Sequence, residues 1–339
     1  MLGSLVGLES SEQQIPASLR FVISWALKIT LSTACVSYIV SQISTEGQVF
    51  IQLAEHLSLL SIEFILLSIF LGVFLLCINW GLEIIKWHAL IGTYLGTKWS
   101  TSIKGVLSGL TIGVFTPNRI GEFIGRVLAI GPTKRVAATL LSLVNGLAQS
   151  VATISFGLFA LALLLNAIIG EELGGVGMVV LRLVLLLTWI LALTIYFNLS
   201  LFANKVSSWK LTVKWTEQLQ LLGQISSAQL NRLYLLSLLR FMTFVGQYFL
   251  VFSFLLPEPN WLLVGGLSVV SLFSNTMLSF LPIPDILIKQ MVALSYFSLF
   301  DFDLSIVSMA VFLVWLINVA LPALAGVSAL MTYRIFKSV

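Results

Sequence analysis

The 339-residue chain is 58% hydrophobic and only 9% charged, with a mean hydropathy of +1.04. A soluble domain of this length cannot bury that much apolar surface, so the composition excludes an ordinary soluble globular protein. The formal net charge of +4 comes from basic residues at the ends of apolar stretches, where they meet anionic headgroups. No nucleic-acid-binding signature accompanies these residues, so we expect no nucleic-acid partner.

Apolar stretches of about 20 residues, each long enough to cross a bilayer, recur along the whole chain. They do not alternate with period two, which argues against a β-barrel. The sequence therefore predicts an all-α, polytopic membrane helix bundle. A cytoplasmic tail is expected over 1–19 and a single transmembrane domain over 20–334. Six crossings are expected at about 20–43, 57–79, 136–169, 175–199, 233–256 and 304–332.

Two further apolar segments, at about 102–130 and 261–300, have like charges at both of their ends. Lys98 and Lys134 flank the first segment, whereas acidic residues flank the second. Because lysine and arginine favour the cytoplasmic side, each segment should enter and leave on one side. We predict two re-entrant helical hairpins that face each other, a pattern typical of inverted-repeat transporters. The alternative is a set of eight to ten plain crossings.

The same distribution of basic residues predicts that both chain termini are cytoplasmic. The expected location is the cytoplasmic (inner) membrane of a bacterium. Between the fourth and fifth crossings, the polar stretch 202–231 carries apolar residues at helical spacing with lysines between them. This pattern fits an amphipathic helix that lies in the membrane interface and contacts anionic lipid. A solvated connector is the alternative.

The sharpest motif is Thr-Pro-Asn-Arg-Ile-Gly-Glu-Phe-Ile-Gly-Arg at 116–126. Its Thr-Pro pair predicts that one half-helix ends near Phe115 and that another begins at Pro117. Arg119, Glu122 and Arg126 then share one face of the second half-helix. Two guanidinium groups beside a half-helix N-terminus favour a phosphate ligand. The alternatives are a structural ion-pair network and a basic hairpin end in the wet interface.

The second broken segment carries Asp285 and Lys289 at i, i+4, which predicts a local salt bridge or a lining role in a gate. Arg240 lies within the fifth crossing. Glu63 lies in the second crossing, either as a protonatable group or as the partner of an arginine such as Arg240. Charged side chains inside a bilayer are costly and usually functional, so all four are candidate substrate-binding residues. Asn145 and Gln149 are expected to join helices by hydrogen bonds.

Enzyme signatures are missing from the sequence. His56 and His88 belong to no metal-binding set, and neither a phosphate-binding Walker loop nor a Gly-x-Ser-x-Gly elbow occurs. We therefore predict no catalytic residue, no metal and no cofactor, and we expect a protein that is not an enzyme.

The stretch from Asn79 to Trp87, followed by the motif ending at Arg126, resembles the membrane region of the lysylphosphatidylglycerol synthase/flippase family. Pro117, Gly121 and Glu122 match the pattern of that family's first hairpin. A second family motif is matched by Leu281 and Pro282, while Lys289-Gln290 stands where the family has Arg-Glu. The family's soluble aminoacyl-transferase domain has no counterpart here. The resemblance implies a flippase-like module for an anionic or polyprenyl-linked lipid.

Three functions remain open from the sequence. The first is a lipid translocase or lipid-binding module for an anionic phospholipid or a polyprenyl-phosphate-linked lipid. The second is a membrane-embedded transferase, or its partner subunit, in lipid or glycolipid synthesis. The third is a secondary transporter for a small solute. Membrane lipids are the expected partners, and a homo-oligomer or a complex with a biosynthetic enzyme is also possible.

Overall fold

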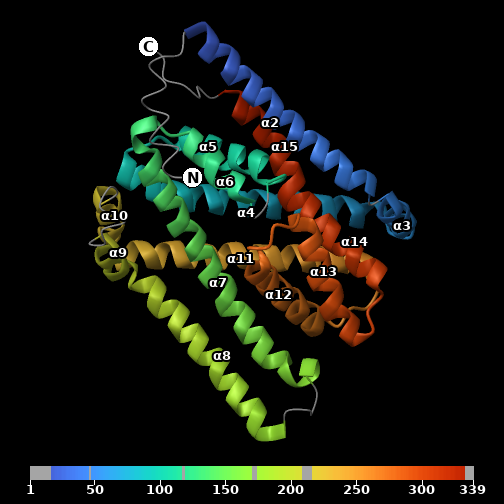
Figure 1. Ribbon diagram of the computed structural model, residues 1–339. Helices are drawn as coiled ribbons and strands as arrows, with labels where there is room; N and C mark the ends of the chain where they lie inside the picture. Colours follow the sequence, from blue (N-terminus) through green and yellow to red (C-terminus); the bar gives the residue numbers. More distant parts are fainter. Residues whose placement is uncertain (1–16, 46, 117–118, 170–173, 208–215, 333–339) are drawn as a thin grey trace.

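The computed structural model describes residues 17–45, 47–116, 119–169, 174–207 and 216–332. Within these ranges the chain is helical and forms no strand, so the prediction of an all-α polytopic bundle is confirmed. The helices, shown in Figure 1, are α2 (Ala17–Thr45), α3 (Gly47–Ser58), α4 (Ile62–Leu95), α5 (Trp99–Gly113), α6 (Ile120–Leu128), α7 (Arg135–Ile169), α8 (Gly174–Phe197), α9 (Leu199–Ser207), α10 (Thr216–Gly223), α11 (Ser227–Leu255), α12 (Trp261–Leu278), α13 (Asp285–Phe297), α14 (Leu304–Trp315) and α15 (Leu321–Met331). Short 3-10 turns precede α7 and follow α13, and a π-helical segment, η5 (Leu316–Ala320), joins α14 to α15.

Seven helical segments in the described part of the chain are long and apolar enough to cross a membrane. Six of them correspond to the predicted crossings, and the seventh, Trp261–Leu278, is the first arm of the second predicted hairpin. Large apolar side chains cover the outside of the bundle. Phe70 and Phe74 on α4, and Leu183 and Leu187 on α8, are more than half exposed. Apolar surface of this kind is stable only against hydrocarbon or a partner, which fits a multi-pass membrane protein.

Helix α4 corrects the predicted end of the second crossing. We expected that crossing to end near Asn79, with the following residues at the inner interface. Instead α4 begins after the cap at Ser61, whose side chain accepts a hydrogen bond from the Phe64 amide, and runs without a break to Leu95. It ends at Gly96, whose left-handed backbone (φ 65°) closes the last turn. The polar residues after Asn79 suggested an end, but they lie on the buried face of a continuing helix.

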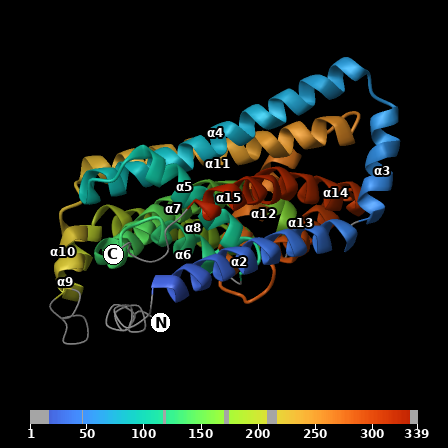
Figure 2. The same ribbon diagram turned by 90° about the horizontal axis from the view of Figure 1, so that it is seen from above.

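Helices α4 and α11 lie side by side and run in opposite directions (Figure 2). Near the end of α4, the Ala89 carbonyl accepts a hydrogen bond of 2.7 Å from Gln229, which lies in the first turn of α11. Near the start of α4, Gly72 faces Leu250 in the last part of α11. The end of α4 and the end of α11 therefore lie at opposite ends of the bundle.

The first predicted hairpin is formed by α5 and α6. Helix α5 begins just after α4 ends, and α6 returns to the same end of the bundle, because Lys134 beyond α6 donates a hydrogen bond of 2.8 Å to the Leu95 carbonyl at the end of α4. Neither arm is among the segments long enough to cross a membrane. This helix pair has the geometry of a re-entrant hairpin.

The second hairpin, α12 and α13, starts and ends beside the last turns of α11. Trp261 at its start packs edge-on against Phe249, with ring centroids 5.6 Å apart. Phe297 at its end stacks on Phe252 at 5.5 Å. Because α11 is antiparallel to α4, the two hairpins enter the bundle from opposite ends. The order of long helix, hairpin and long helix thus occurs twice in opposite directions, as in an inverted repeat.

Glycines allow the arms of the first hairpin to touch backbone to backbone. A Cβ atom on Gly125 would lie 2.5 Å from the Cα of Gly109, and one on Gly109 would lie 2.8 Å from the Glu122 carbonyl oxygen. Small residues at four-residue spacing are typical of such close helix packing in membranes. The close approach fixes α6, and with it the charged face of the motif.

The interfacial stretch and the tail are only partly covered by the structure. Most of α9, all of α10 and the start of α11 lie within 202–231. Residues 208–215, with several of the lysines and apolar residues of the predicted amphipathic helix, fall outside the described residues. Most of the predicted tail at 1–19 also lies outside them, and helix α2 begins at Ala17. The amphipathic helix and the domain boundaries stay predictions.

Gly125→Ala is expected to destabilise the protein by about 1–3 kcal/mol, because the added methyl group collides with backbone atoms of α5 that cannot move aside. The measurement is thermal unfolding of the purified protein in detergent. Gly246→Ala in α11 is the matched control, since its Cβ would meet only Leu75, at 4.0 Å. Equal stability of the two variants would contradict the close packing of α5 and α6.

Cysteines placed at positions 98 and 134 should react with an impermeant thiol reagent from the same side of the membrane, and a cysteine at position 258 from the other side. The native Cys35 and Cys77 are first replaced by serine. Labelling of intact cells and of inverted vesicles gives the two accessibilities. Reaction at positions 98 and 134 from opposite sides would show that α5 and α6 cross the bilayer rather than form a hairpin.

Candidate functional site

The break of the first hairpin lies at the centre of the bundle. Helix α5 ends at Gly113, and Thr116 accepts a hydrogen bond of 2.9 Å from the Gly121 amide, so its side chain caps the start of α6. The second half-helix begins at Ile120, a few residues later than predicted; Pro117 lies outside the described residues. Arg119 precedes it in a left-handed backbone conformation (φ 52°), which is costly for a residue with a side chain and clusters at functional sites.

The charged face of α6 is present as predicted. Arg119, Glu122 and Arg126 all line one cavity. Glu122 forms ion pairs with both arginines: a short one with Arg119 and one of 3.7 Å with Arg126. The closer carboxylate for Arg126, however, is not Glu122. Its guanidinium lies 2.7 Å from an oxygen of Glu83 on α4, which the motif alone did not reveal.

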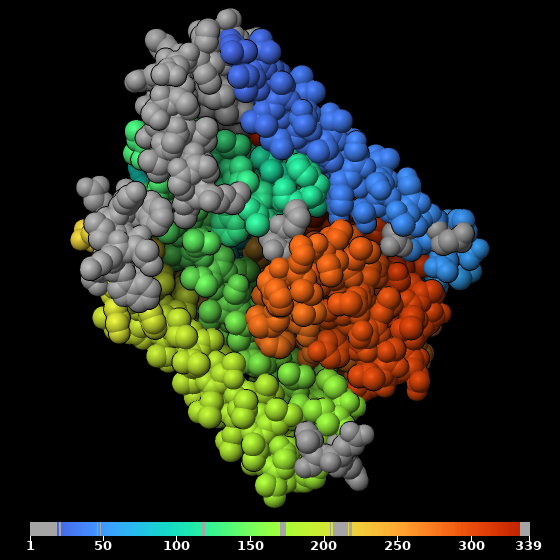
Figure 3. Space-filling model, in the orientation of Figure 1, coloured from blue at the N-terminus to red at the C-terminus, as the bar shows by residue number. Residues whose placement is uncertain are grey.

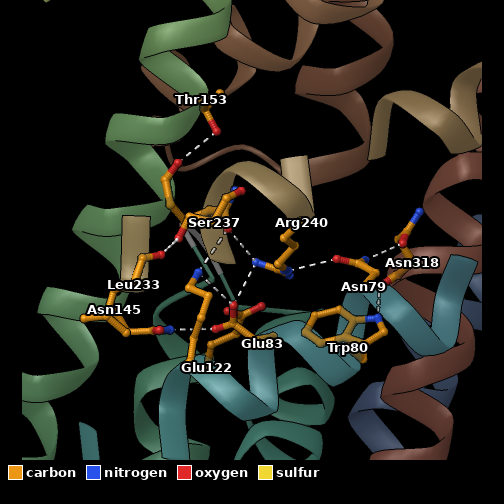
Figure 4. Close-up of polar contacts among 12 residues, drawn as sticks. Asn79, Trp80, Glu83, Glu122, Asn145, Thr153, Leu233, Ser237, Arg240 and Asn318 are labelled. Atoms are coloured by element: carbon orange, nitrogen blue, oxygen red, sulfur yellow. Dashed lines mark hydrogen bonds and ion pairs between the residues drawn. The ribbon is translucent and has the colours of Figure 1, made fainter. Parts of the chain in front are cut away.

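Glu83 is the centre of a buried ion network (Figure 4). Its side chain is 3% exposed and accepts contacts from three cations: Arg126 at 2.7 Å, Arg240 at 3.0 Å and Lys86 at 3.3 Å. The amide of Asn145 adds a hydrogen bond of 2.7 Å. Four helices, α4, α6, α7 and α11, therefore meet at one carboxylate. One negative charge faces three positive charges in a low-dielectric interior, so its removal would leave buried cations uncompensated.

A chain of neutral amides extends the network across the bundle. Arg240 donates to Asn79 at 2.8 Å, and Asn79 donates to Asn318 at 2.6 Å. Asn318 donates in turn to Gln247 at 2.7 Å, and its own carbonyl accepts a hydrogen bond from Trp80. Asn318 lies within the π-helical segment η5, a distortion that is frequent at functional sites. Buried polar groups in a membrane need such partners. Each of these side chains has at least one, while Nε2 of Gln247 has none among the described residues.

The break of the second hairpin faces the same cavity. Helix α12 ends at Leu278, and α13 starts at Asp285 after the Pro282 and Pro284 turn. Asp285 and Lys289 form the predicted i, i+4 salt bridge, and both line the cavity. The N-termini of α6 and α13 thus border the same cavity, although their hairpins enter the bundle from opposite ends.

The cavity has a volume of about 300 Å³. Its charged lining, within the described residues, comprises four cationic side chains and three carboxylates: Arg119, Arg126, Arg240, Lys289, Glu83, Glu122 and Asp285. Lys86, hydrogen-bonded to both Glu83 and Gln149, adds another positive charge behind this wall. The charge is arranged in two layers. Arg119 is 31% exposed, whereas Arg126 is 8% exposed and Lys86 is fully buried.

Of the seven residues predicted to bind substrate, six meet at this cavity and one does not. Glu63 lies in the first turn of α4, exposed and far along the helix from Glu83. It is therefore not the partner of Arg240, and that prediction was wrong: the partner is Glu83. The hydropathy pattern could not separate the two glutamates, because both lie on one long apolar helix.

Sequence reasoning missed four central residues: Glu83, Lys86, Asn79 and Asn318. The sequence predicts that the second crossing ends near Asn79, yet the first three of these residues are all buried within the bundle. Their spacing held a signal, since Asn79, Glu83 and Lys86 recur at four and three residues and share one helix face. Asn145 and Gln149 do join helices as expected, through Glu83 and through Lys86.

Comparison with protein-family models, with curated proteins and with solved structures found no match to this chain. The resemblance to the lysylphosphatidylglycerol synthase/flippase family stays a prediction. What the site can do must be argued from its geometry.

Glu83→Gln should destabilise the protein by about 3–5 kcal/mol, because an amide keeps the shape of the side chain but leaves the buried Lys86 and Arg240 without a carboxylate partner, and leaves Arg126 with only its longer contact to Glu122. Thermal unfolding in detergent measures the loss. Glu63→Gln, a neutralisation at an exposed position on the same helix, is the matched control and should unfold like the wild type. If Glu83→Gln also unfolded like the wild type, the network would not hold the four helices together.

Proposed function

We propose that this chain is a flippase-like membrane protein that binds the headgroup of an anionic lipid in the central cavity and moves it between the two leaflets. The observation that carries the proposal is the meeting of two oppositely directed hairpin breaks at one cavity with an excess of positive charge. Transporters built from inverted repeats bind substrate at this kind of place, near the midplane and between broken helices.

The chemistry of the lining favours a phosphate. Arginine guanidinium groups match phosphate oxygens in pairs, and the N-terminus of a half-helix adds partial positive charge. Arg119 is the most exposed of the paired charges and lies at the N-terminus of α6, so a headgroup would meet it first. Lys289, on the first turns of α13, is the second accessible cation.

The size of the cavity favours a headgroup over a whole lipid. A volume of about 300 Å³ is at the lower end of the range for small-molecule sites. Acyl or prenyl chains would stay in the hydrocarbon. Figure 3 shows the surfaces of α6 and α7 beside that of the second hairpin on one outer face of the bundle, and we place the entry of a lipid headgroup on this face.

The finer features of the proposal follow from the sequence. The protein would lie in a bacterial cytoplasmic membrane with both termini in the cytoplasm, as the distribution of lysine and arginine indicates. Movement of the lipid would be passive or coupled to an ion gradient. The resemblance to the lysylphosphatidylglycerol synthase/flippase family supports a lipid substrate, and membrane lipids are the proposed partners.

Arg119→Gln and Lys289→Gln should each weaken retention of anionic phospholipid about tenfold, since each removes a charge-assisted contact with the phosphate. Native mass spectrometry of the purified variants, titrated with phosphatidylglycerol, gives the bound fraction. Lys98→Gln, which removes an exposed cation at the start of α5, is the control and should bind like the wild type. Equal binding by all four proteins would overturn the assignment of the cavity as the headgroup site.

Transport itself is tested in liposomes. Wild-type protein should make a fluorescent phosphatidylglycerol in the inner leaflet accessible to an impermeant quencher, and Arg119→Gln should do so more slowly. If lipid binds to the cavity but never changes leaflet, the protein is a lipid-binding module rather than a translocase.

A further inference from the structure

Five residues that line the cavity carry a buried side-chain atom with no hydrogen-bond partner among the residues that the structure describes. Two of these atoms, on Arg119 and Glu122, belong to an ion pair. The other three are Nε of Arg126, Oδ1 of Asn145 and Nε1 of Trp315. Each side chain is more than nine-tenths buried, and they come from three different helices, α6, α7 and α14. Unpaired buried atoms also occur elsewhere in the described part of the chain, but these three belong to residues that line one charged cavity. Because an unpaired buried polar group is costly, a ligand in this cavity that pairs with them would be stabilised.

These three atoms need hydrogen-bond partners of opposite kinds, two acceptors and one donor. The Arg126 and Trp315 nitrogens can only donate, so they need an acceptor such as a phosphate oxygen. The Asn145 oxygen can only accept, so it needs a donor. The orientation of this amide is fixed, because its nitrogen donates to Glu83, and a carboxylate cannot donate in return. A fully ionised phosphate alone would leave the Asn145 oxygen unpaired.

The charge of the cavity decides which donor is favoured. An ammonium group, as in an aminoacylated or ethanolamine headgroup, could donate to Asn145, but it would enter a space whose charged lining already carries more cations than carboxylates. Like charges at short range in a low-dielectric site repel strongly. A neutral hydroxyl group supplies the same hydrogen bond without this cost.

The neighbouring wall has the same character. Gln149, Ser150 and Thr153 also line the cavity from α7 and are polar but uncharged. The Gln149 amide already bonds Lys86 and Arg240, and the Thr153 hydroxyl donates to the Gln149 carbonyl, which leaves the Thr153 oxygen able to accept a hydrogen bond. Phe241 and Phe244 on α11 line the cavity as apolar surfaces. Neutral polar groups beside aromatic rings suit a small polyol. Its hydroxyl groups can bind the polar side chains, and its carbon skeleton can pack on the rings.

We infer that the ligand of this cavity is a lipid phosphate that carries a hydroxylated group, either glycerol or a sugar, whose hydroxyl donates to Asn145. The inference rests on the proposed function and narrows its substrate class. It disfavours a headgroup that bears an ammonium ion.

The test is a headgroup series on the wild-type protein, measured by native mass spectrometry with lipids of matched chains. Phosphatidic acid presents the phosphate alone, phosphatidylethanolamine adds an ammonium group, and phosphatidylglycerol adds hydroxyls; a polyprenyl-phosphate hexose presents the sugar. At least one hydroxylated lipid should bind about tenfold more tightly than phosphatidic acid or phosphatidylethanolamine, as expected when a buried acceptor gains its partner. Whether phosphatidylglycerol or the hexose binds more tightly identifies the source of the hydroxyl group.

Two variants locate the effect. Asn145→Ala should reduce the preference for hydroxylated lipid over phosphatidic acid to within about twofold, because the acceptor is gone. The control is Asn166→Ala, elsewhere on α7, which removes an amide that accepts a hydrogen bond from Arg182 on α8. This variant should keep the preference for hydroxylated lipid. The ratio of two affinities in one variant cancels a general loss of stability.

The outcomes separate this inference from the proposed function. If phosphatidic acid binds as tightly as the hydroxylated lipids, and Arg119→Gln weakens all of them, the phosphate site stands and the hydroxyl inference is wrong. Tighter binding of phosphatidylethanolamine would also overturn it. If no lipid binds the wild type above background, both proposals fail together.

Discussion

The buried carboxylate of Glu83 is the interaction on which the rest of the arrangement depends. It pairs with three cations from α4, α6 and α11, and without it Lys86 and Arg240 would have no carboxylate partner in a low-dielectric interior. Because Arg126 lies on the second arm of the first hairpin, the same contact anchors that arm to the long helices. One ion network therefore sets both the stability of the centre and the position of the charged face that lines the cavity.

The two hairpins place their helix breaks beside this central ion network. Backbone contact between Gly109 and Gly125 holds the first hairpin closed, while aromatic packing against α11 fixes the second. Since the two enter from opposite ends, their breaks meet inside the bundle, where exposed backbone groups are tolerated only beside protein or a wet space. The accessible Arg119 and Lys289 lie at these breaks, in front of the buried network. The buried charges that join the helices thus lie deeper in the bundle than the accessible charges of Arg119 and Lys289.

Much of the fold could be predicted from the sequence. Hydropathy located the six crossings, and the alternation of basic and acidic flanks indicated both hairpins, because charge distribution records which side of a membrane a loop occupies. Helical spacing placed Arg119, Glu122 and Arg126 on one face, and it paired Asp285 with Lys289. The errors concerned the start of α6, the end of α4 and the partner of Arg240. The spacing of Asn79, Glu83 and Lys86 held a signal for the continuation of α4, whereas no local pattern identifies the partner of Arg240.

What the sequence determined by itself was therefore the class of protein and the local geometry of each motif, since apolar length, charge at the ends of spans and helical periodicity are properties of neighbouring residues. What only the tertiary structure decided was which charges meet. Glu83 contacts Arg240, which is far away in the chain, while Glu63 on the same helix contacts neither it nor the cavity. The physical reason is that an ion pair depends on the register of packed helices, and that register is set by contacts between distant segments rather than by the pattern within either helix.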